Sequence, residues 1–125
     1  MKRFILLVVL LALALPASSQ TAANFTRTED VIYGRKFGTA LTLDVFQPAK
    51  PNGCGVVYMV SGGWFSDHGG INAKMYAAFL DRGYTVFAIV HGSQPKFTIP
   101  EITQDIHRAI RFVRHNAARW GGESR

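Results

Sequence analysis

The chain has 125 residues, of which 48% are hydrophobic and 18% charged, and its formal net charge is +6. This apolar share excludes a disordered or low-complexity protein, and the length allows one domain. The single cysteine, Cys54, excludes an internal disulfide. We interpret Cys54 as a small residue at the start of a strand rather than as a reactive thiol, because no basic or histidine neighbour that would lower its pKa is evident.

The first 19 residues have the pattern of a secretory signal peptide. Lys2 and Arg3 precede an uncharged apolar run over 4–15, and small residues follow at Ala17 and Ser19. The run is shorter than the roughly 20 residues that a transmembrane helix needs. We therefore predict cleavage after Ser19 and a secreted or periplasmic product with no stable membrane insertion. Loss of the two cations would reduce the net charge from +6 to +4.

A hairpin is predicted at the start of the mature chain. Residues 20–29 are polar and without a period, so we expect a flexible leader there. Residues 31–35 and 41–46 then alternate apolar with polar side chains, which is typical of half-buried strands. The turn signal Gly38-Thr39 between them predicts an antiparallel pair, and a turn-rich stretch over 47–55 follows.

Two strands and two helices are predicted after the hairpin. Residues 56–60 and 84–90 are continuous apolar runs, typical of strands buried on both faces in a parallel sheet. Residues 71–82 have helical spacing, with apolar residues at Ile71, Met75, Ala78 and Phe79. Residues 100–119 carry a longer apolar stripe, formed by Ile102, Ile106, Ala109, Ile110, Val113 and Ala117. Residues 30–125 thus predict an α/β domain: an antiparallel hairpin leading into a βαβα unit of a mixed, mostly parallel sheet.

A glycine-rich loop over 61–70 follows the first of these buried strands. In open α/β sheets the loops at the carboxyl ends of the strands line the binding site. The pair Gly62-Gly63 allows a tight turn that presents backbone N–H groups to a ligand oxygen, as an oxyanion hole requires. On this pattern alone, a plain loop is an equally good interpretation.

Four segments together carry a family resemblance. The sequence Ser-Gly-Gly-Trp over 61–64 is similar to a His-Gly-Gly-Gly-Trp oxyanion loop, and Leu-Asp-Val-Phe-Gln-Pro over 43–48 is similar to a Leu-Asp-Val-Tyr-x-Pro strand. Residues 83–88 resemble the fourth strand of the same fold, and residues 105–122 resemble the helix before its nucleophile strand. The chain thus resembles the N-terminal portion of an α/β-hydrolase, in particular of the secreted carboxylesterase and feruloyl-esterase-like group, over nearly all of 30–125.

The resemblance implies roles for the residues of this loop. Gly62, Gly63 and Trp64 would form the oxyanion hole, with Trp64 beside the acyl pocket. Substrate contacts are expected from three residues near that loop: Ser61, Phe65 and His91. The sequence departs from the family pattern at Val60 and Ser61, which stand where the family has His and Gly, so the bracing role of that histidine is lost.

The rest of the catalytic machinery is expected outside this sequence. The chain contains no Gly-x-Ser-x-Gly, and the resemblance places the nucleophile, acid and base beyond Arg125. We therefore expect the N-terminal part of a serine hydrolase that acts on small-molecule or polysaccharide-linked carboxylic esters without a cofactor, and that is inactive as this chain alone. Ser66, Asp67 and His68 offer the residue types of a triad, but adjacent residues rarely reach one another in its geometry. We interpret them as a polar rim.

Two other interpretations remain open. The chain could be a small exported α/β binding domain whose glycine loop holds an anion without turnover, or a non-functional gene fragment.

The basic side of the last helix is interpreted as a solvated face rather than a nucleic-acid site; it carries Arg108, Arg111, Arg114, His107 and His115. No two histidines are spaced i, i+4, so no metal site is predicted. The oligomeric state is left undetermined.

Overall fold

The computed structural model describes residues 24–122, so the predicted signal peptide lies outside the described part. The strands are β1 (Phe25–Lys36), β2 (Thr39–Pro48), β3 (Gly55–Met59) and β4 (Thr85–Ile89). The α-helices are α1 (Ala77–Leu80) and α2 (Ile99–His115), and the 3₁₀ turns are η1 (His68–Gly70), η2 (Ala73–Tyr76) and η3 (Ala117–Trp120). Over the described residues, every helix falls short of the length and apolar content that crossing a membrane would require.

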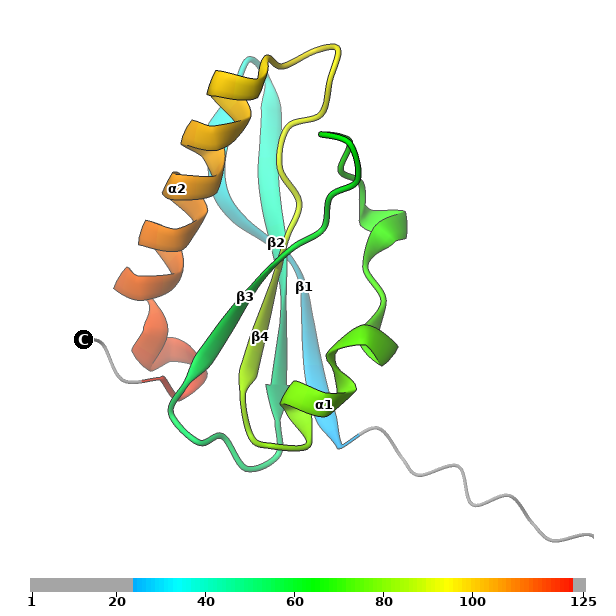
Figure 1. Cartoon of the computed structure of the whole chain (residues 1–125). Helices are drawn as coiled ribbons and strands as arrows, with labels where there is room; N and C mark the ends of the chain where they lie inside the picture. The colour runs from blue at the N-terminus through cyan, green and yellow to red at the C-terminus, as the bar shows by residue number, and fades with distance from the viewer. Residues whose placement is uncertain (1–23, 123–125) are drawn as a thin grey trace, which may run out of the picture.

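The four described strands form one mixed sheet in the order β1-β2-β4-β3 (Figure 1). β1 and β2 are antiparallel, which confirms the predicted hairpin. β2 and β4 are also antiparallel. β3 and β4 are parallel, with Val56 opposite Val86 and Met59 opposite Ile89. Two of the three described pairings are therefore antiparallel, because the hairpin contributes both strands on one side of β4.

β3 lies at an edge of the described sheet and is less buried than predicted. Its residues are exposed or half-buried, whereas every residue of β4 is buried. The continuous apolar sequence of 56–60 predicted burial on both faces, and this is wrong for β3 within residues 24–122. The reason is positional, since β4 has a strand on each side and β3 has one on a single side.

β1 begins earlier than predicted, so the expectation of a flexible leader over 20–29 is wrong for residues 25–29. The Phe25 ring packs 5.6 Å from that of Phe46. The Arg27 guanidinium donates hydrogen bonds of 2.8 and 2.6 Å to the carboxylate of Asp44, which is fully buried. Both partners lie on β2, so the polar, aperiodic local sequence could not reveal this pairing.

Helices cover both faces of the sheet (Figure 1). On one face, α2 and η3 pack on the strands through Tyr33, Leu41, Leu43, Val45, Phe87, Ile89, Ala109, Val113 and Trp120. On the other face, η2 and α1 enclose a second cluster formed by Phe46, Val60, Tyr76, Leu80, Val86, Ala88 and Val90. The sheet is thus the middle of three layers, and each layer of helix covers its own half of the core.

The segment 71–82 was predicted as one helix but forms η2 followed by a single turn of α-helix. Tyr76 and Leu80 face the sheet, while Met75 and Phe79, which belong to the predicted stripe, are exposed. Tyr76 decides this phase, because its ring packs edge-on against Phe46 at 5.0 Å. Packing in the folded chain therefore overrides the local apolar spacing.

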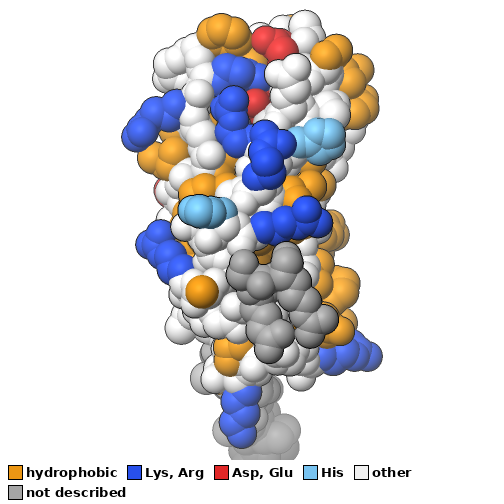
Figure 2. All heavy atoms as spheres, turned by 90° about the vertical axis from the view of Figure 1, so that its left-hand side faces the viewer, with side chains coloured by type: hydrophobic (Ala, Val, Ile, Leu, Met, Phe, Trp, Pro, Cys, Tyr) orange, Lys and Arg blue, Asp and Glu red, His pale blue; other side chains and the backbone are white. Residues whose placement is uncertain are grey.

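α2 confirms the predicted apolar stripe at Ile102, Ala109 and Val113, which are buried. The opposite face is basic: Figure 2 shows Lys and Arg side chains gathered on this side of the molecule. Along α2, the exposed residues on that face include His107, Arg111, Arg114 and His115. Arg108 differs from them, since it is half-buried and its side chain lies against Gly34 of β1.

Candidate functional site

The loops after β3 and β4 lie side by side at the carboxyl ends of these parallel strands. The N–H of Val60 donates to the carbonyl of Ile89 at 2.9 Å, so the first loop begins beside the second. Tyr33 of β1 anchors the start of the second loop, because its hydroxyl donates to the Val90 carbonyl at 3.0 Å. Burial raises the pKa of this phenol, which keeps it a hydrogen-bond donor. This is the edge of the sheet at which the sequence predicted a site.

A tight turn over 62–65 forms the tip of the first loop. The N–H of Gly62 donates to the carbonyl of Phe65 at 2.9 Å, and the N–H of Phe65 donates back at 3.0 Å. The two central residues have positive φ, +57° at Gly63 and +68° at Trp64. Such a conformation costs a non-glycine residue on the order of 1–3 kcal/mol, so surrounding contacts must hold Trp64 in place.

The turn leaves two adjacent backbone donors for a ligand. Within residues 24–122, the N–H groups of Gly63 and Trp64 have no hydrogen-bond acceptor. The N–H of Gly62, which the resemblance also assigned to the oxyanion hole, is already bonded to Phe65. The geometry therefore favours Gly63 and Trp64 over Gly62, and the oxyanion role itself stays a prediction.

Two serines clamp the far end of this turn to the loop after β4. The N–H of Ser66 donates to Ser93 Oγ at 2.7 Å, and Ser93 Oγ donates to the Ser66 carbonyl at 2.7 Å. The Ser66 hydroxyl donates to the carbonyl of Val60 and accepts the N–H of His91 at 3.2 Å. Ser93 was not predicted as a site residue, although its position just after a predicted buried strand was an available signal.

The three predicted substrate contacts divide into two groups. Ser61 and Phe65 are exposed at the loop, and the Phe65 side chain is 57% exposed beside Trp64 at 41%. His91 is only 3% exposed, and both of its ring nitrogens have partners. The structure does not support a substrate contact by His91, because the ring is buried beneath the loop.

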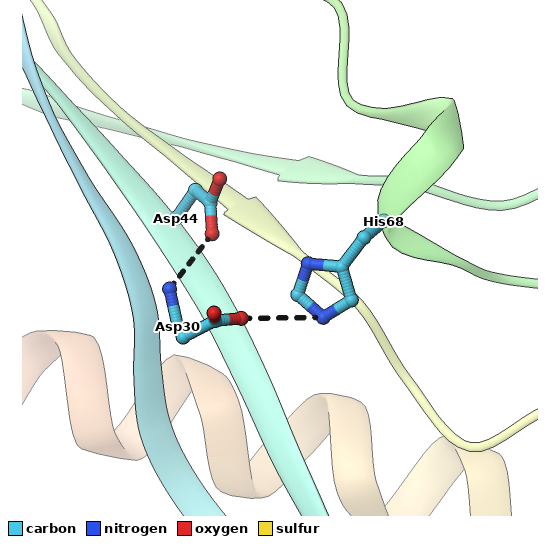
Figure 3. Close-up of side chains that lie close together, drawn as sticks. All are labelled: Asp30, Asp44 and His68. Carbon is cyan, nitrogen blue, oxygen red and sulfur yellow. Dashed lines mark hydrogen bonds and ion pairs between the residues drawn. The ribbon is translucent and has the colours of Figure 1, made fainter.

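A polar cluster of Asp30, Asp44 and His68 lies where β1 and β2 meet η1 (Figure 3). One ligand atom from each residue lies within 4.8 Å of the others. Asp44 already accepts hydrogen bonds from Arg27 and, at 3.1 Å, from the N–H of Asp30. Because Arg27 balances the buried charge, we interpret the cluster as an anchor between segments rather than as a metal centre.

The adjacent residues Ser66, Asp67 and His68 do not form a triad. His68 Nε2 lies 2.9 Å from Thr42 Oγ1 and 3.5 Å from an Asp30 carboxylate oxygen, so it turns towards the sheet. The Ser66 hydroxyl instead bonds the backbone of Val60. The positive φ of Asp30 at a β-bulge brings it to His68, and nothing in the local sequence signals that contact.

A groove lies at the opposite end of the strands from this loop. It has a volume of about 630 Å³ and runs between the start of β3 and the end of α2, beside residues that include Cys54, Val57, Val113 and Trp120. Cys54 is a free thiol at the entry to β3, and its backbone N–H donates to Asn52 Oδ1 at 2.8 Å. The groove therefore follows the open edge of β3 and is separate from the candidate site.

Solved esterase structures share this architecture. The chain superposes on a form of esterase B from Lactobacillus rhamnosis carrying a C6-C4 SN3 inhibitor, with a TM-score of 0.70 and 21% identity. It also matches the esterase Est2 of Thermogutta terrifontis, with a TM-score of 0.67 and 24% identity. The matches cover 86% and 77% of this chain but only 36% of each esterase. The described structure therefore matches the N-terminal portion of an α/β-hydrolase fold.

Sequence comparison gives the same grouping. The chain is 28% identical over 95 residues to the probable isoprenylcysteine alpha-carbonyl methylesterase ICMEL1 of Oryza sativa subsp. japonica. That match covers 74% of this chain and 22% of the rice protein. The BD-FAE family model matches residues 43–125, a range that includes residues 43–48 of β2, the glycine turn and all of α2. With most of its length inside that match, the chain belongs to the BD-FAE family.

Proposed function

We propose that this chain forms the oxyanion-binding part of a secreted serine hydrolase that acts on carboxylic esters. The observation that carries the proposal is the pair of adjacent N–H groups at Gly63 and Trp64, which are held in a tight turn without an acceptor in residues 24–122. In ester hydrolysis, negative charge develops on the carbonyl oxygen of the tetrahedral intermediate. Each preorganised donor of this kind stabilises the transition state by about 2.7–4 kcal/mol.

Small-molecule esters are the proposed substrates, with polysaccharide-linked esters as the other class. The Thermogutta Est2 esterase has been solved with propionate and with butyrate bound, which supports a site for a carboxylic acyl group. Trp64 and Phe65 are exposed next to the two donors and would offer an apolar surface to that group. The nucleophile, acid and base would come from residues beyond Arg125, and the reaction would need no cofactor.

The proposal is tested by the coding sequence past the codon for Arg125. We expect a Gly-x-Ser-x-Gly within about 20 further residues, because the nucleophile elbow of this fold follows the next strand. The longer product should hydrolyse p-nitrophenyl acetate, while the 125-residue chain alone should stay at the background rate. Export should be visible as loss of residues 1–19 from the mature protein in mass spectrometry.

Two outcomes would contradict the proposal. A longer product without esterase activity, despite an intact elbow, would favour a binding domain. Turnover by the 125-residue chain that a serine-directed inhibitor abolishes would show that the nucleophile lies within this sequence. In the longer product, Trp64→Pro removes one of the two proposed donors, and His107→Gln, a change on the exposed face of α2, is the control. Trp64→Pro should lower kcat about 100-fold or more, and its left-handed φ makes a check of folding by circular dichroism necessary.

A further inference from the structure

His91 is a buried histidine at the candidate site with no role in the proposed reaction. Its Nδ1 lies 2.7 Å from the carbonyl oxygen of Gly92, and its Nε2 lies 2.8 Å from the hydroxyl of Ser61. A carbonyl oxygen only accepts hydrogen bonds, so the proton must be on Nδ1. In the neutral ring Nε2 is then an acceptor, and the Ser61 hydroxyl donates to it.

The hydrogen bond from Ser61 ties the start of the turn to the neighbouring loop. Ser61 immediately precedes Gly62, whose N–H closes the turn against Phe65. His91 is itself fixed in place. The residue is only 3% exposed, and its backbone N–H donates to Ser66 Oγ at 3.2 Å. One buried residue therefore contacts both sides of the turn, Ser61 before it and Ser66 after it.

We propose that Ser61 and His91 are a positioning pair that fixes the turn carrying the Gly63 and Trp64 donors. This inference rests on the proposed function, since the donors matter only if the turn binds an oxyanion. His91 acts through Ser61 and does not touch the reacting atoms. The pair replaces the bracing that the sequence lacks at Val60, and it does so from the loop after β4 instead of from the glycine loop itself.

The geometry explains why a fixed turn matters here. Donors stabilise a developing charge best when they already point at its position before the reaction. The positive φ of Trp64 is energetically unfavourable for a non-glycine residue. A turn without anchoring contacts would therefore change conformation and redirect both N–H groups. The Ser66–Ser93 hydrogen bonds hold one end of the turn, and the Ser61–His91 bond is the matching restraint at the other end.

The test uses the full 125-residue chain labelled with ¹⁵N and compares Ser61→Ala with Ser61→Thr. All samples, the reference chain included, carry Val57→Lys, because a charge on the open edge of β3 opposes association of the chain. Loss of one hydrogen bond should lower the hydrogen-exchange protection of the Gly62 and Phe65 amides about fivefold in Ser61→Ala. Ser61→Thr keeps a hydroxyl and should restore most of that protection. Protection of Val86 and Ala88 in β4 should stay within about twofold in both variants, which shows that the fold is intact.

Two spectroscopic readouts separate positioning from a merely structural contact. The imidazole nitrogens of His91 should show the Nδ1–H tautomer, with the Nε2 signal moving only in Ser61→Ala. Acetate, used as a carboxylate probe, should shift the amide signals of Gly63 and Trp64 and bind about fivefold more weakly to Ser61→Ala than to wild type or Ser61→Thr. His107→Gln, a change on the exposed face of α2, is the control and should change neither quantity.

The outcomes distinguish this inference from the proposed function. Unchanged protection of Gly62 and Phe65 in Ser61→Ala would overturn the positioning pair, whatever acetate does. A wild-type chain whose Gly63 and Trp64 amides do not respond to acetate would instead count against the oxyanion proposal. Labelling of Ser61 by a fluorophosphonate would also overturn the inference, because the hydroxyl would then be a nucleophile and not a restraint.

Discussion

Among the described residues 24–122, three non-glycine residues adopt the left-handed backbone conformation, and each is held by contacts from another segment. Asp30 donates its N–H to Asp44 on β2, and the ring of Phe37 stacks 6.3 Å from that of Phe97. The carbonyl of Trp64 accepts an N–H from the loop after β4 at 3.4 Å. Each conformation costs on the order of 1–3 kcal/mol, and these contacts offset that cost. Trp64 is the one of the three that lies in the turn with the proposed donors.

Gly63 and Gly62 form a matched pair for measuring this backbone cost. A Cβ added at either position meets no atom within 4 Å, but only Gly63 has positive φ. We therefore expect Gly63→Ala to lower the free energy of unfolding by about 1 kcal/mol, and Gly62→Ala to change it by less than about 0.5 kcal/mol. Urea denaturation of the two variants checks this, and equal effects would show that the turn is not closed as described.

At the scale of elements, a helix could be predicted from the sequence where the residues that determine it lie close together along the chain. α2 was predictable because its stripe and its first-turn residues are local features of the sequence. The helix at 71–82 was not, since the contact of Tyr76 with Phe46 sets its phase. The site divides in the same way, because the glycine pair is visible in the sequence, whereas the bonds of His91 join two separate loops.

The start of α2 gives a pH-dependent prediction. The N–H and hydroxyl of Thr98 both donate to the Glu101 carboxylate at 2.8 Å, and these bonds lower the pKa of Glu101 from its ordinary value of 4.5. A carboxylate whose pKa is lowered on folding stabilises the fold above its unfolded pKa, and this contribution is lost as the pH falls through the folded value. The stability of Glu101→Gln should therefore fall less than that of wild type as the pH is lowered below the ordinary carboxyl pKa of 4.5.

Unfolding free energies at several pH values, measured for wild type and Glu101→Gln, check this sign. Asp81→Asn is a suitable control, because Asp81 is exposed and its side chain forms no ion pair within residues 24–122. A Glu101→Gln variant that is as acid-sensitive as wild type would show that the Thr98 bonds do not persist in solution.

The two edges of the described sheet differ in character. β1 carries charged residues along its length, including Arg27, Arg35 and Lys36, which discourage pairing with another chain. β3 has the sequence Gly-Val-Val-Tyr-Met, without a charge, and Val57 is 37% exposed on it. The open edge of β3 and the groove beside it are therefore the surface of the described chain most able to add a strand.

Association of the 125-residue chain through β3 is the expected consequence. At about 10–100 μM we expect wild type to form concentration-dependent oligomers or aggregates, because an apolar unpaired strand is a template for further pairing. Val57→Lys should shift the chain towards monomer, since a charge on an edge strand blocks that pairing. Ile99→Lys adds the same charge at a site of similar exposure (39%) on α2, away from the sheet edge, and should have little effect. Sedimentation velocity across this range measures the difference. A monomeric wild type, or equal rescue by both variants, would exclude the β3 edge as the cause.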